Sequence, residues 1–303
     1  MEWQAEPTFL IAADCGGTKC RVRIYGYMGN IIGEAVAGPA NMSLGPEKTL
    51  SEIITASRLA ISQCGLPITF ENTVVSAGIA GLVDDEAAEL LKSLSHPFKE
   101  FHAASDAFIA YLGAFQGDQP NAAIAIFGTG SIVFGQDEKG HFTLGGWGLP
   151  LSDQGSGARL GQLAVRESLK AVEGIQPQSP LTQQIIQRLG GSAGSIYRWS
   201  LEATPADYAI FCPDILNAAD LGDEVAKVLV KTTQQEAQNL LAATAARGVT
   251  SIGLMGGLSE FYKNNLHEKY LPLITTIKGD AMDGARLMAK RNLAPLKLDA
   301  TAS

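Results

Sequence analysis

The sequence predicts an α/β protein, and three observations support that prediction. Short apolar runs alternate with longer segments in which apolar residues recur at helical spacing, a pattern typical of sheets covered by helices. Two segments far apart in the chain share one layout, in which a strand, a glycine turn, a strand, a glycine-tipped turn and a third strand follow one another. The two turn glycines are 12 positions apart in both, from Gly17 to Gly29 and from Gly128 to Gly140. We therefore expect two related halves.

Length and charge set the limits of the prediction. The chain has 303 residues, enough for two domains, and a formal net charge of −8 with no run of clustered Lys and Arg. Sequence-independent binding of nucleic acid needs clustered cations to displace counterions, so we expect no nucleic-acid partner. A small anion can still bind, because backbone N–H groups hold anions without any net positive charge.

The four cysteines and the N-terminal segment predict a cytoplasmic protein. The cysteines are scattered, with no CxxC pair, and are expected to be reduced thiols: Cys15, Cys20, Cys64 and Cys212. The first residues lack the basic region of a signal peptide, and Asp14 soon interrupts the apolar run. No stretch of about eighteen apolar residues occurs, so we expect no membrane span.

The first part of the chain predicts a meander followed by alternating helices and strands. Three strands are expected at Phe9–Ala13, Arg21–Tyr25 and Ile31–Ala37. A helix with apolar residues on one face begins at Pro46 and is ended by Gly65. A buried strand follows in "TVVSAGIAG", and "FKEFHAASDA" carries a short strand into another helix.

The second part repeats the meander and then becomes mainly helical. Strands are expected on both sides of the glycine turn in "NAAIAIFGTGSIVFGQ", with a third in "HFTLGG". Helices are expected in "GARLGQLAVRESLKAVEG", from about Asp223 to Arg247, and in "DAMDGARLMAK", and a buried strand in "SIGLM". We place a domain boundary near Asn121, where "GDQPN" separates the two parts.

Glycines end three of the predicted strands. They occur in "DCGGTK" (Gly16, Gly17, Thr18, Lys19), in "GTGS" (Gly128, Thr129, Gly130) and in the pair Gly256-Gly257. Glycine permits positive φ and lets a ligand approach the backbone, and consecutive N–H groups form a concavity for phosphate oxygens. Each turn alone is also typical of a simple hairpin, but the three together favour a nucleotide cleft. No Gly-Lys dipeptide and no GxGxxG after a strand occur, which excludes the common P-loop and dinucleotide motifs.

Two aspartates are candidates for the chemistry. Asp14 ends a buried strand beside the first glycine turn, where it could hold Mg²⁺ with substrate phosphates or simply brace the turn. Asp106 follows a short strand and begins an apolar helix, so it is a candidate general base or a helix N-cap. Lys19 could reach a phosphate or lie in solvent.

The loop "GGWGLPLSDQGSG" has the composition of a carbohydrate-binding surface. A tryptophan face packs against a sugar ring, and polar side chains bond its hydroxyls. The candidates are Gly146, Trp147, Ser152, Asp153 and Gln154, with Asn41 in the earlier loop "GPANMSLG". A buried tryptophan, a helix-capping aspartate and a turn-forming asparagine are the structural alternatives.

Several motifs, in order, resemble the actin/hexokinase/Hsp70-like ATPase superfamily. They are "DCGGTKCR", "FGTGS", "LMGG" and "DAMDGA", which resemble its first and second phosphate, adenosine and second connecting motifs. The combination of "GGWG…SDQGSG" with "SDA" and "GPAN" is more similar to the N-acetylglucosamine and bacterial glucosamine kinases, in the BadF/BadG/BcrA/BcrD-type group.

This resemblance implies two ribonuclease-H-like domains with a nucleotide cleft between them. The first would span 1–120 and be joined by the C-terminal helix 281–303, and the second, with helical additions, would span 121–280. The resemblance implies an ATP- and Mg²⁺-dependent kinase acting on the 6-hydroxyl of N-acetylglucosamine or glucosamine, with a homodimer as a family-level expectation.

The resemblance also implies a role for each matching residue. Asp106 would be the catalytic base and Asp14 would serve the metal. Thr18 and Thr129 would contact phosphates, Gly256 and Gly257 would lie near the adenosine, and Asn41, Trp147, Ser152 and Asp153 would line the sugar. The alternatives are a related ATPase activator of acyl-CoA dehydratases or reductases, and a non-enzymatic sugar sensor. The activators hold an iron–sulfur cluster through cysteines, and this chain has none between Cys64 and Cys212.

Overall fold

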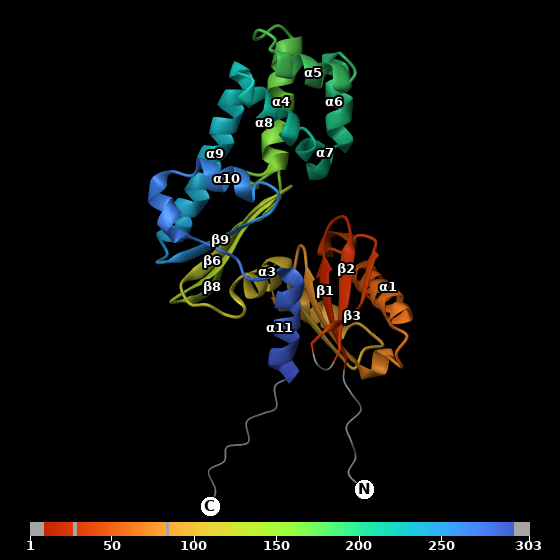
Figure 1. Ribbon diagram of the computed structural model, residues 1–303. Helices are drawn as coiled ribbons and strands as arrows, with labels where there is room; N and C mark the ends of the chain where they lie inside the picture. Colours follow the sequence, from red (N-terminus) through yellow and green to blue (C-terminus); the bar gives the residue numbers. More distant parts are fainter. Residues whose placement is uncertain (1–8, 27–28, 83–84, 294–303) are drawn as a thin grey trace, which may run out of the picture. The chain divides into compact units, whose positions relative to one another are not determined.

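The computed structural model describes residues 9–26, 29–82 and 85–293. The chain forms two compact units, coloured along the sequence in Figure 1. The first unit contains the described residues up to Gln119 together with those from Ile277 onward, and the second runs from Pro120 to Thr276. The last helix of the chain therefore belongs to the unit in which the chain begins.

The first unit contains a mixed five-stranded sheet. Its strands are β1 (Phe9–Cys15), β2 (Cys20–Tyr25), β3 (Ile31–Ala37), β4 (Thr73–Ile79) and β5 (Glu100–Ser105). The spatial order is β3-β2-β1-β4-β5, in which β1, β2 and β3 pair antiparallel and β1, β4 and β5 pair parallel. The three strands predicted at the start of the chain are confirmed, and the first two reach one or two residues further into the glycine turn.

Helices cover both faces of this sheet. Helices α1 (Pro46–Cys64) and α2 (Asp85–Ser93) bury the face that carries Ile11, Val22 and Val75. Helices α3 (Asp106–Phe115) and α11 (Ala281–Leu293) pack on the other face, over β1 and β4. The short 3₁₀ helices η1 (Met42–Leu44) and η2 (Phe70–Asn72) lie in the connections.

Two glycines let α3 and α11 touch backbone to backbone (Figure 1). A Cβ on Gly113 of α3 would lie 1.9 Å from the carbonyl oxygen of Asp280, and one on Gly284 of α11 would lie 1.7 Å from that of Ile109. Both distances are far below van der Waals contact, so only glycine fits at this crossing. The crossing attaches the C-terminal helix to the first unit.

The sheet of the second unit repeats the topology of the first. Its strands are β6 (Ala122–Phe127), β7 (Ser131–Asp137), β8 (Gly140–Gly145), β9 (Ser251–Met255) and β10 (Ile274–Thr275). The order is β8-β7-β6-β9-β10, with β6, β7 and β8 antiparallel and β6, β9 and β10 parallel. The predicted α/β class and the two related halves are therefore confirmed.

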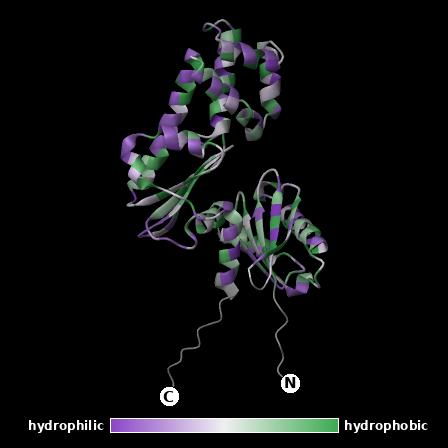
Figure 2. Cartoon of the chain, in the orientation of Figure 1, coloured by the Kyte–Doolittle hydropathy of each residue, from purple (hydrophilic) through white to green (hydrophobic). Residues whose placement is uncertain are grey.

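Most helices of the second unit lie between β8 and β9. They are α4 (Gly157–Val172), α5 (Pro180–Arg188), α6 (Ala193–Glu202), α7 (Pro205–Ala209), α8 (Cys212–Asp220) and α9 (Glu224–Ala245), while α10 (Ser259–Asn265) and η3 (Glu268–Leu273) precede β10. These helices carry both hydrophobic and hydrophilic residues (Figure 2), as is typical of helices that cover a core. Side-chain N-caps that accept a backbone N–H fix several of their starts, at Ser156, Ser179, Ser192, Thr204 and Asp223.

Two further expectations concern the whole described chain. None of the helices in the described ranges is long and apolar enough to cross a membrane. Cys15, Cys20, Cys64 and Cys212 are all free thiols, as expected. The Sγ atoms of Cys15 and Cys20 lie 2.8 Å apart on the buried side of the first glycine turn.

Candidate functional site

Two aspartates meet at one edge of the first sheet. Strands β1, β4 and β5 run parallel, and the register pairs Cys15 with Ile79 and Ile79 with Ser105. Asp14 is the penultimate residue of β1, and Asp106 directly follows β5. The carboxyl ends of parallel strands share an edge, so two residues 92 positions apart in sequence become electrostatic neighbours.

Asp106 is the first residue of α3 and is not its N-cap. Ser105 is the cap, and its Oγ accepts a hydrogen bond from the Phe108 N–H at 3.1 Å. The carboxylate of Asp106 accepts one from the adjacent Ala107 N–H at 2.9 Å. The structural alternative of a capping aspartate is therefore wrong, because the preceding serine takes that place.

The environment of Asp106 opposes its charge. Burial raises the pKa of Asp106 above its ordinary value, the bond from Ala107 lowers it in part, and the nearby charge of Asp14 raises it further. A carboxyl group whose pKa is raised accepts a proton more readily near neutral pH. This is the property required of a general base.

Asp14 pairs with an arginine on the neighbouring strand. Its Oδ2 lies 3.4 Å from Nη2 of Arg21, which is its direct partner in the antiparallel register. Burial raises the pKa of Asp14, Arg21 acts in the opposite direction, and Asp280 raises the pKa again. The sequence left open that Asp14 braces the glycine turn beside it. That turn is closed by a backbone hydrogen bond, which the Gly16 N–H donates to the Lys19 carbonyl at 2.9 Å.

The first glycine turn leaves donors available to a ligand. Within the described part of the chain, the N–H groups of Gly17 and Thr18 have no protein acceptor. Neither Gly16 nor Gly17 has a φ in the left-handed region, so backbone conformation does not require glycine at these two positions. A Cβ on Gly17 would meet only Asn41 Nδ2, at 3.8 Å. The fold itself does not require glycine at this position.

Asn41 lies beside this turn and also shapes its own loop. It forms an isolated parallel bridge with Ala80, just beyond β4. Its Oδ1 accepts a hydrogen bond from the Ser43 N–H at 3.0 Å and so caps η1. The turn-forming alternative is confirmed, and the Nδ2 donor still lies near Gly17.

The second glycine turn is held by the start of α4. The Gly157 and Ala158 N–H groups donate to the carbonyls of Gly128 and Thr129 at 2.8 and 3.1 Å. The turn is closed by the Gly128 N–H, which donates to the Gly130 carbonyl at 2.9 Å. The N–H groups of Thr129 and Gly130 have no acceptor among the residues described. The turn thus keeps two donors available, like the first turn.

Asp153 lies against the second turn. It is only 5% exposed, has a φ of 64°, and its Oδ1 accepts a hydrogen bond from the Ser131 N–H at 3.3 Å. A Cβ on Gly130 would come within 3.2 Å of this carboxylate. Burial raises the pKa of Asp153, and the bond from Ser131 offsets this only in part. Ser156, three residues later, is the cap of α4, so the helix-capping alternative for Asp153 is wrong.

The rest of this loop presents an exposed aromatic face. Trp147 is 67% exposed, so the alternative of a buried core tryptophan is wrong. Gly146 has a φ of 79°, and a Cβ there would lie 2.7 Å from Ile132. The Ser152 hydroxyl donates to the Gln154 side-chain oxygen at 3.1 Å. Ser152 and Gln154, two of the residues predicted to contact a sugar, are therefore hydrogen-bonded to each other.

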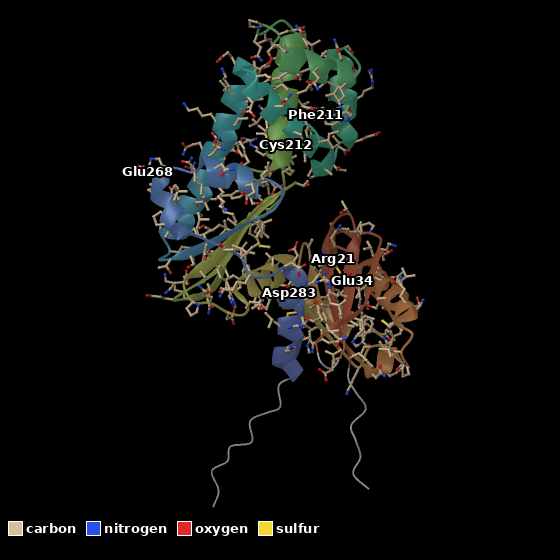
Figure 3. The ribbon with its side chains drawn as sticks, in the orientation of Figure 1. Arg21, Glu34, Phe211, Cys212, Glu268 and Asp283 are labelled. Carbon is tan, nitrogen blue, oxygen red and sulfur yellow. The ribbon has the colours of Figure 1, made fainter. Side chains whose placement is uncertain are left out.

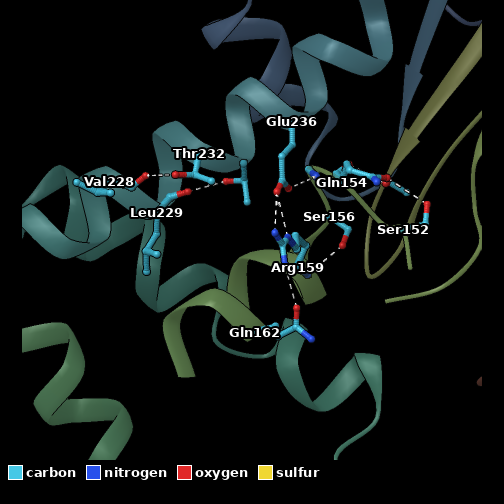
Figure 4. Close-up of polar contacts among 12 residues, drawn as sticks. Ser152, Gln154, Ser156, Arg159, Gln162, Val228, Leu229, Thr232 and Glu236 are labelled. Carbon is cyan, nitrogen blue, oxygen red and sulfur yellow. Dashed lines mark hydrogen bonds and ion pairs between the residues drawn. The ribbon is translucent and has the colours of Figure 1, made fainter. Parts of the chain in front are cut away.

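Helices α9 and α10 hold the loop in place through residues that the sequence did not single out, and Figure 4 shows the contacts of Glu236 on α9. Glu236 of α9 accepts hydrogen bonds from the Gly155 N–H at 3.2 Å and from Arg159 Nη2 at 3.0 Å. The hydroxyl of Tyr262 donates to the Gly155 carbonyl. Helical periodicity alone could not distinguish these two residues from other polar residues on the same helices.

The glycine pair after β9 differs between its members. Gly256 has a φ of 89°, and a Cβ there would lie 2.3 Å from the Phe127 carbonyl oxygen. A Cβ on Gly257 would meet nothing within 4 Å. Gly256 is therefore required by the fold, and Gly257 is not.

The sequence also did not single out Arg21 and Asp280. They lie on β2 and immediately before α11, and both face Asp14. The alternation of arginines in "CRVRIY" was the available signal, since residues two apart on a strand share a face. The described residues contain no group of three or more His, Cys, Asp or Glu side chains that could hold a metal ion.

Known proteins match almost the whole chain. The model of the BadF/BadG/BcrA/BcrD ATPase family matches residues 13–278. The glucosamine kinase GspK of Vibrio cholerae is 35% identical over 282 residues, which cover 93% of this chain and 95% of that protein. The N-acetylmuramic acid/N-acetylglucosamine kinase of Clostridium acetobutylicum is 24% identical, with coverage of 93% and 98%.

Solved structures agree with this match. A Chromobacterium violaceum protein, described as a candidate N-acetylglucosamine kinase, superposes with a TM-score of 0.85 at 30% identity, covering 94% of this chain and 99% of that one. A glucokinase of the ROK family from Streptomyces griseus has a TM-score of 0.53 at 18% identity, covers 93% and 99%, and supports the fold alone. The predicted actin-like fold is thus confirmed, and this chain belongs to the BadF/BadG/BcrA/BcrD ATPase family.

Proposed function

We propose that this protein transfers the γ-phosphoryl group of ATP to the 6-hydroxyl of glucosamine or N-acetylglucosamine. The chain is an amino-sugar kinase, a phosphotransferase with an alcohol group as acceptor, since the relatives that match over most of its length are kinases of these sugars. The related activator of acyl-CoA dehydratases is not favoured, because these relatives phosphorylate sugars. The observation that carries the proposal is the largely enclosed carboxylate of Asp106, which lies beside Asp14 and the first glycine turn. The choice of the 6-hydroxyl follows the resemblance to the amino-sugar kinases.

Asp106 acts as the general base. The sugar oxygen attacks the γ-phosphorus, the bond from that phosphorus to the bridging oxygen of ADP breaks, and the hydroxyl proton passes to the Asp106 carboxylate. The products are a sugar phosphate and ADP. The raised pKa of Asp106 supports this role, because it moves the carboxyl group toward the pH at which the enzyme works.

The glycine turns bind the phosphates. The available N–H groups of Gly17, Thr18, Thr129 and Gly130 can donate to phosphate oxygens as negative charge shifts during transfer. The hydroxyls of Thr18 and Thr129, together with Lys19, add further donors. The open space at Gly128 and Gly257 supports a ligand role, because a Cβ there would meet no atom of the protein within 4 Å.

Asp14 is the residue that would hold Mg²⁺, directly or through water. Mg²⁺ at a nucleotide binds one or two carboxylates plus phosphates and water, and the partly exposed Asp14 carboxylate beside the first glycine turn offers one such ligand. The ion would neutralise phosphate charge. Trp147, with Gly146, Ser152, Asp153 and Gln154 of the same loop and Asn41 of the first unit, is proposed to contact the sugar.

The test is ADP release measured with glucosamine, N-acetylglucosamine and their 6-deoxy analogues. We expect turnover with at least one amino sugar, none with its 6-deoxy form, and a phosphorus–carbon coupling in the NMR spectrum of the product that locates the phosphate on C6. Turnover of a 6-deoxy sugar would refute the 6-hydroxyl assignment. A complete lack of sugar-stimulated ADP release would refute the kinase.

A further inference from the structure

Arg21 lies between two carboxylates that come from distant parts of the chain. Its Nη2 is 3.4 Å from Oδ2 of Asp14 on β1 and 3.6 Å from Oδ2 of Asp280, the residue before α11. Figure 3 labels Arg21 among the strands of the first unit. Both contacts run through the same nitrogen, and the one to Asp14 is within hydrogen-bond distance. The contacts therefore link β1 to the C-terminal helix.

Asp280 is itself firmly held. Its Oδ1 accepts a hydrogen bond from the Asp283 N–H at 3.0 Å, and its own N–H donates to Asp283 Oδ2 at 3.1 Å. Its carbonyl oxygen lies where a Cβ on Gly113 would be, at the crossing of α3 and α11. Its Oδ2 faces Arg21 and, at 3.8 Å, Nη1 of Arg23, so Asp280 offers Arg21 a fixed anchor.

The other end of the arginine contact is less restrained. In the described chain Asp14 has one ion-pair partner, Arg21, and both side chains are 33% exposed. The Arg21 Nε–H is buried and has no acceptor among the described residues, so the two carboxylates alone orient the guanidinium. An exposed ion pair contributes only about 0–1 kcal/mol to stability. Stability alone is therefore a weak reason for this arrangement.

We propose that Arg21 is a positioning residue that, anchored by Asp280, holds the Asp14 carboxylate in place for the cation of the bound nucleotide. The inference rests on the proposed role of Asp14 toward Mg²⁺. It assigns to Arg21 no contact with substrate. It also gives α11 a function, since the helix start fixes the anchor.

Binding of ADP at a series of Mg²⁺ concentrations, measured by calorimetry, tests this role without any turnover. We expect Arg21→Met to raise the Mg²⁺ concentration needed for half-maximal ADP binding by about tenfold, equivalent to about 1.4 kcal/mol. Binding of ADP without a divalent cation is expected to stay unchanged. Arg21→Lys, which keeps the positive charge but not the guanidinium group, is expected to restore part of the affinity.

Arg23→Met is the matched control. Arg23 lies two residues along on the same face, pairs with Glu34 and lies 3.8 Å from Asp280, but it has no contact with Asp14. We expect Arg23→Met to leave the Mg²⁺ dependence unchanged. Asp280→Asn is expected to reproduce part of the effect of Arg21→Met, and Arg21→Met is expected to add nothing to Asp14→Asn, because residues that act as one unit are not additive.

The outcomes separate this inference from the kinase proposal. Mg²⁺-dependent ADP binding that is weakened by Arg21→Met, in a protein without sugar-stimulated turnover, would refute the kinase and retain the positioning role. Equal effects of Arg21→Met and Arg23→Met, additivity with Asp14→Asn, or no Mg²⁺-dependent ADP binding by the unaltered protein would each overturn the positioning role.

Discussion

At the scale of single residues, Asp106 lies where burial and the nearby carboxylate of Asp14 both disfavour its ionised form. A group of this kind makes the folded state less stable when it is ionised, and the same environment makes it a better base. Activity and stability therefore place opposite demands on this one side chain. A neutral side chain of the same shape should separate them.

The substitution Asp106→Asn tests this trade-off. An amide cannot accept the hydroxyl proton, so we expect kcat to fall by about 10²–10⁴-fold with sugar and ATP binding largely retained. The unfolding midpoint is expected to rise, because a buried charge is removed while the acceptor for the Ala107 N–H is kept. Steady-state kinetics and thermal unfolding measure the two effects.

Ser105→Ala provides the control next to it. This change removes the cap of α3 and is expected to lower stability by about 1 kcal/mol while turnover is largely kept. Retained turnover in Asp106→Asn would show that the carboxylate is not the base. A lowered unfolding midpoint in Asp106→Asn would show that its charge is not a burden on the fold.

The pH dependence of stability gives a second prediction for the same residue. The pKa of Asp106 is raised in the folded state, so the folded protein binds this proton more tightly than the unfolded chain does. The folded state therefore has its full stabilisation from the protonated carboxyl group below the ordinary aspartate pKa of about 3.9. This stabilisation is lost as the pH rises through the raised pKa. The difference in midpoint between Asp106→Asn and the unaltered protein should therefore be small near pH 4 and grow toward neutral pH. A difference that shrinks as the pH rises would contradict the assignment.

At the scale of secondary-structure elements, the glycines of this chain serve two different purposes. Some permit a close approach within the protein, as Gly113 and Gly284 do between α3 and α11. Others lie in open space and are not needed by the fold. The pair after β9 contains one of each kind at adjacent positions, which allows an internal comparison.

We expect Gly256→Ala to destabilise the protein by about 1–3 kcal/mol or more, because the new Cβ would lie 2.3 Å from a carbonyl oxygen and φ is 89°. Gly257→Ala should leave the unfolding midpoint nearly unchanged and weaken ADP binding. Thermal unfolding with and without ADP measures both. If Gly257→Ala bound ADP normally, the proposed place of this turn beside the nucleotide would be wrong.

At the scale of the whole molecule, the chain builds the same five-stranded sheet twice and returns to the first unit at its end. The second unit is continuous in sequence and has its own hydrophobic core. The first unit needs α11, which covers β1 and β4 and crosses α3. The two units should therefore differ in how they depend on the C-terminal segment.

A chain that stops at Thr276 tests this dependence. We expect the fragment 120–276 to unfold cooperatively by itself, since a unit with its own core can fold alone. The chain ending at Thr276 should lose the cooperative unfolding of its first unit while keeping that of the second, as seen in calorimetry. Two intact transitions in this shortened chain would show that α11 is dispensable.

The homodimer and the cytoplasmic location stay predictions.

The sequence predicted those features that depend on neighbours along the chain. The strand–turn–strand pattern around Gly17 and Gly128 indicated the repeated meander, and Gly65 indicated the end of α1, because periodicity and glycine turns act over a few residues. The short helices α5 to α8 were expected only as a helical region. Their starts depend on caps such as Ser192 and Thr204, and serine and threonine are equally common in loops.

By itself, the sequence thus determined the α/β class, the two halves and the polar residues that could serve phosphate and sugar chemistry. Only the tertiary structure decided that Ser105 rather than Asp106 caps α3, that Asp153 supports the second glycine turn, and that Arg21 joins Asp14 to Asp280. The physical reason is strand order and register. Contacts between residues far apart in the chain set both, and no local pattern encodes which strand ends will share an edge.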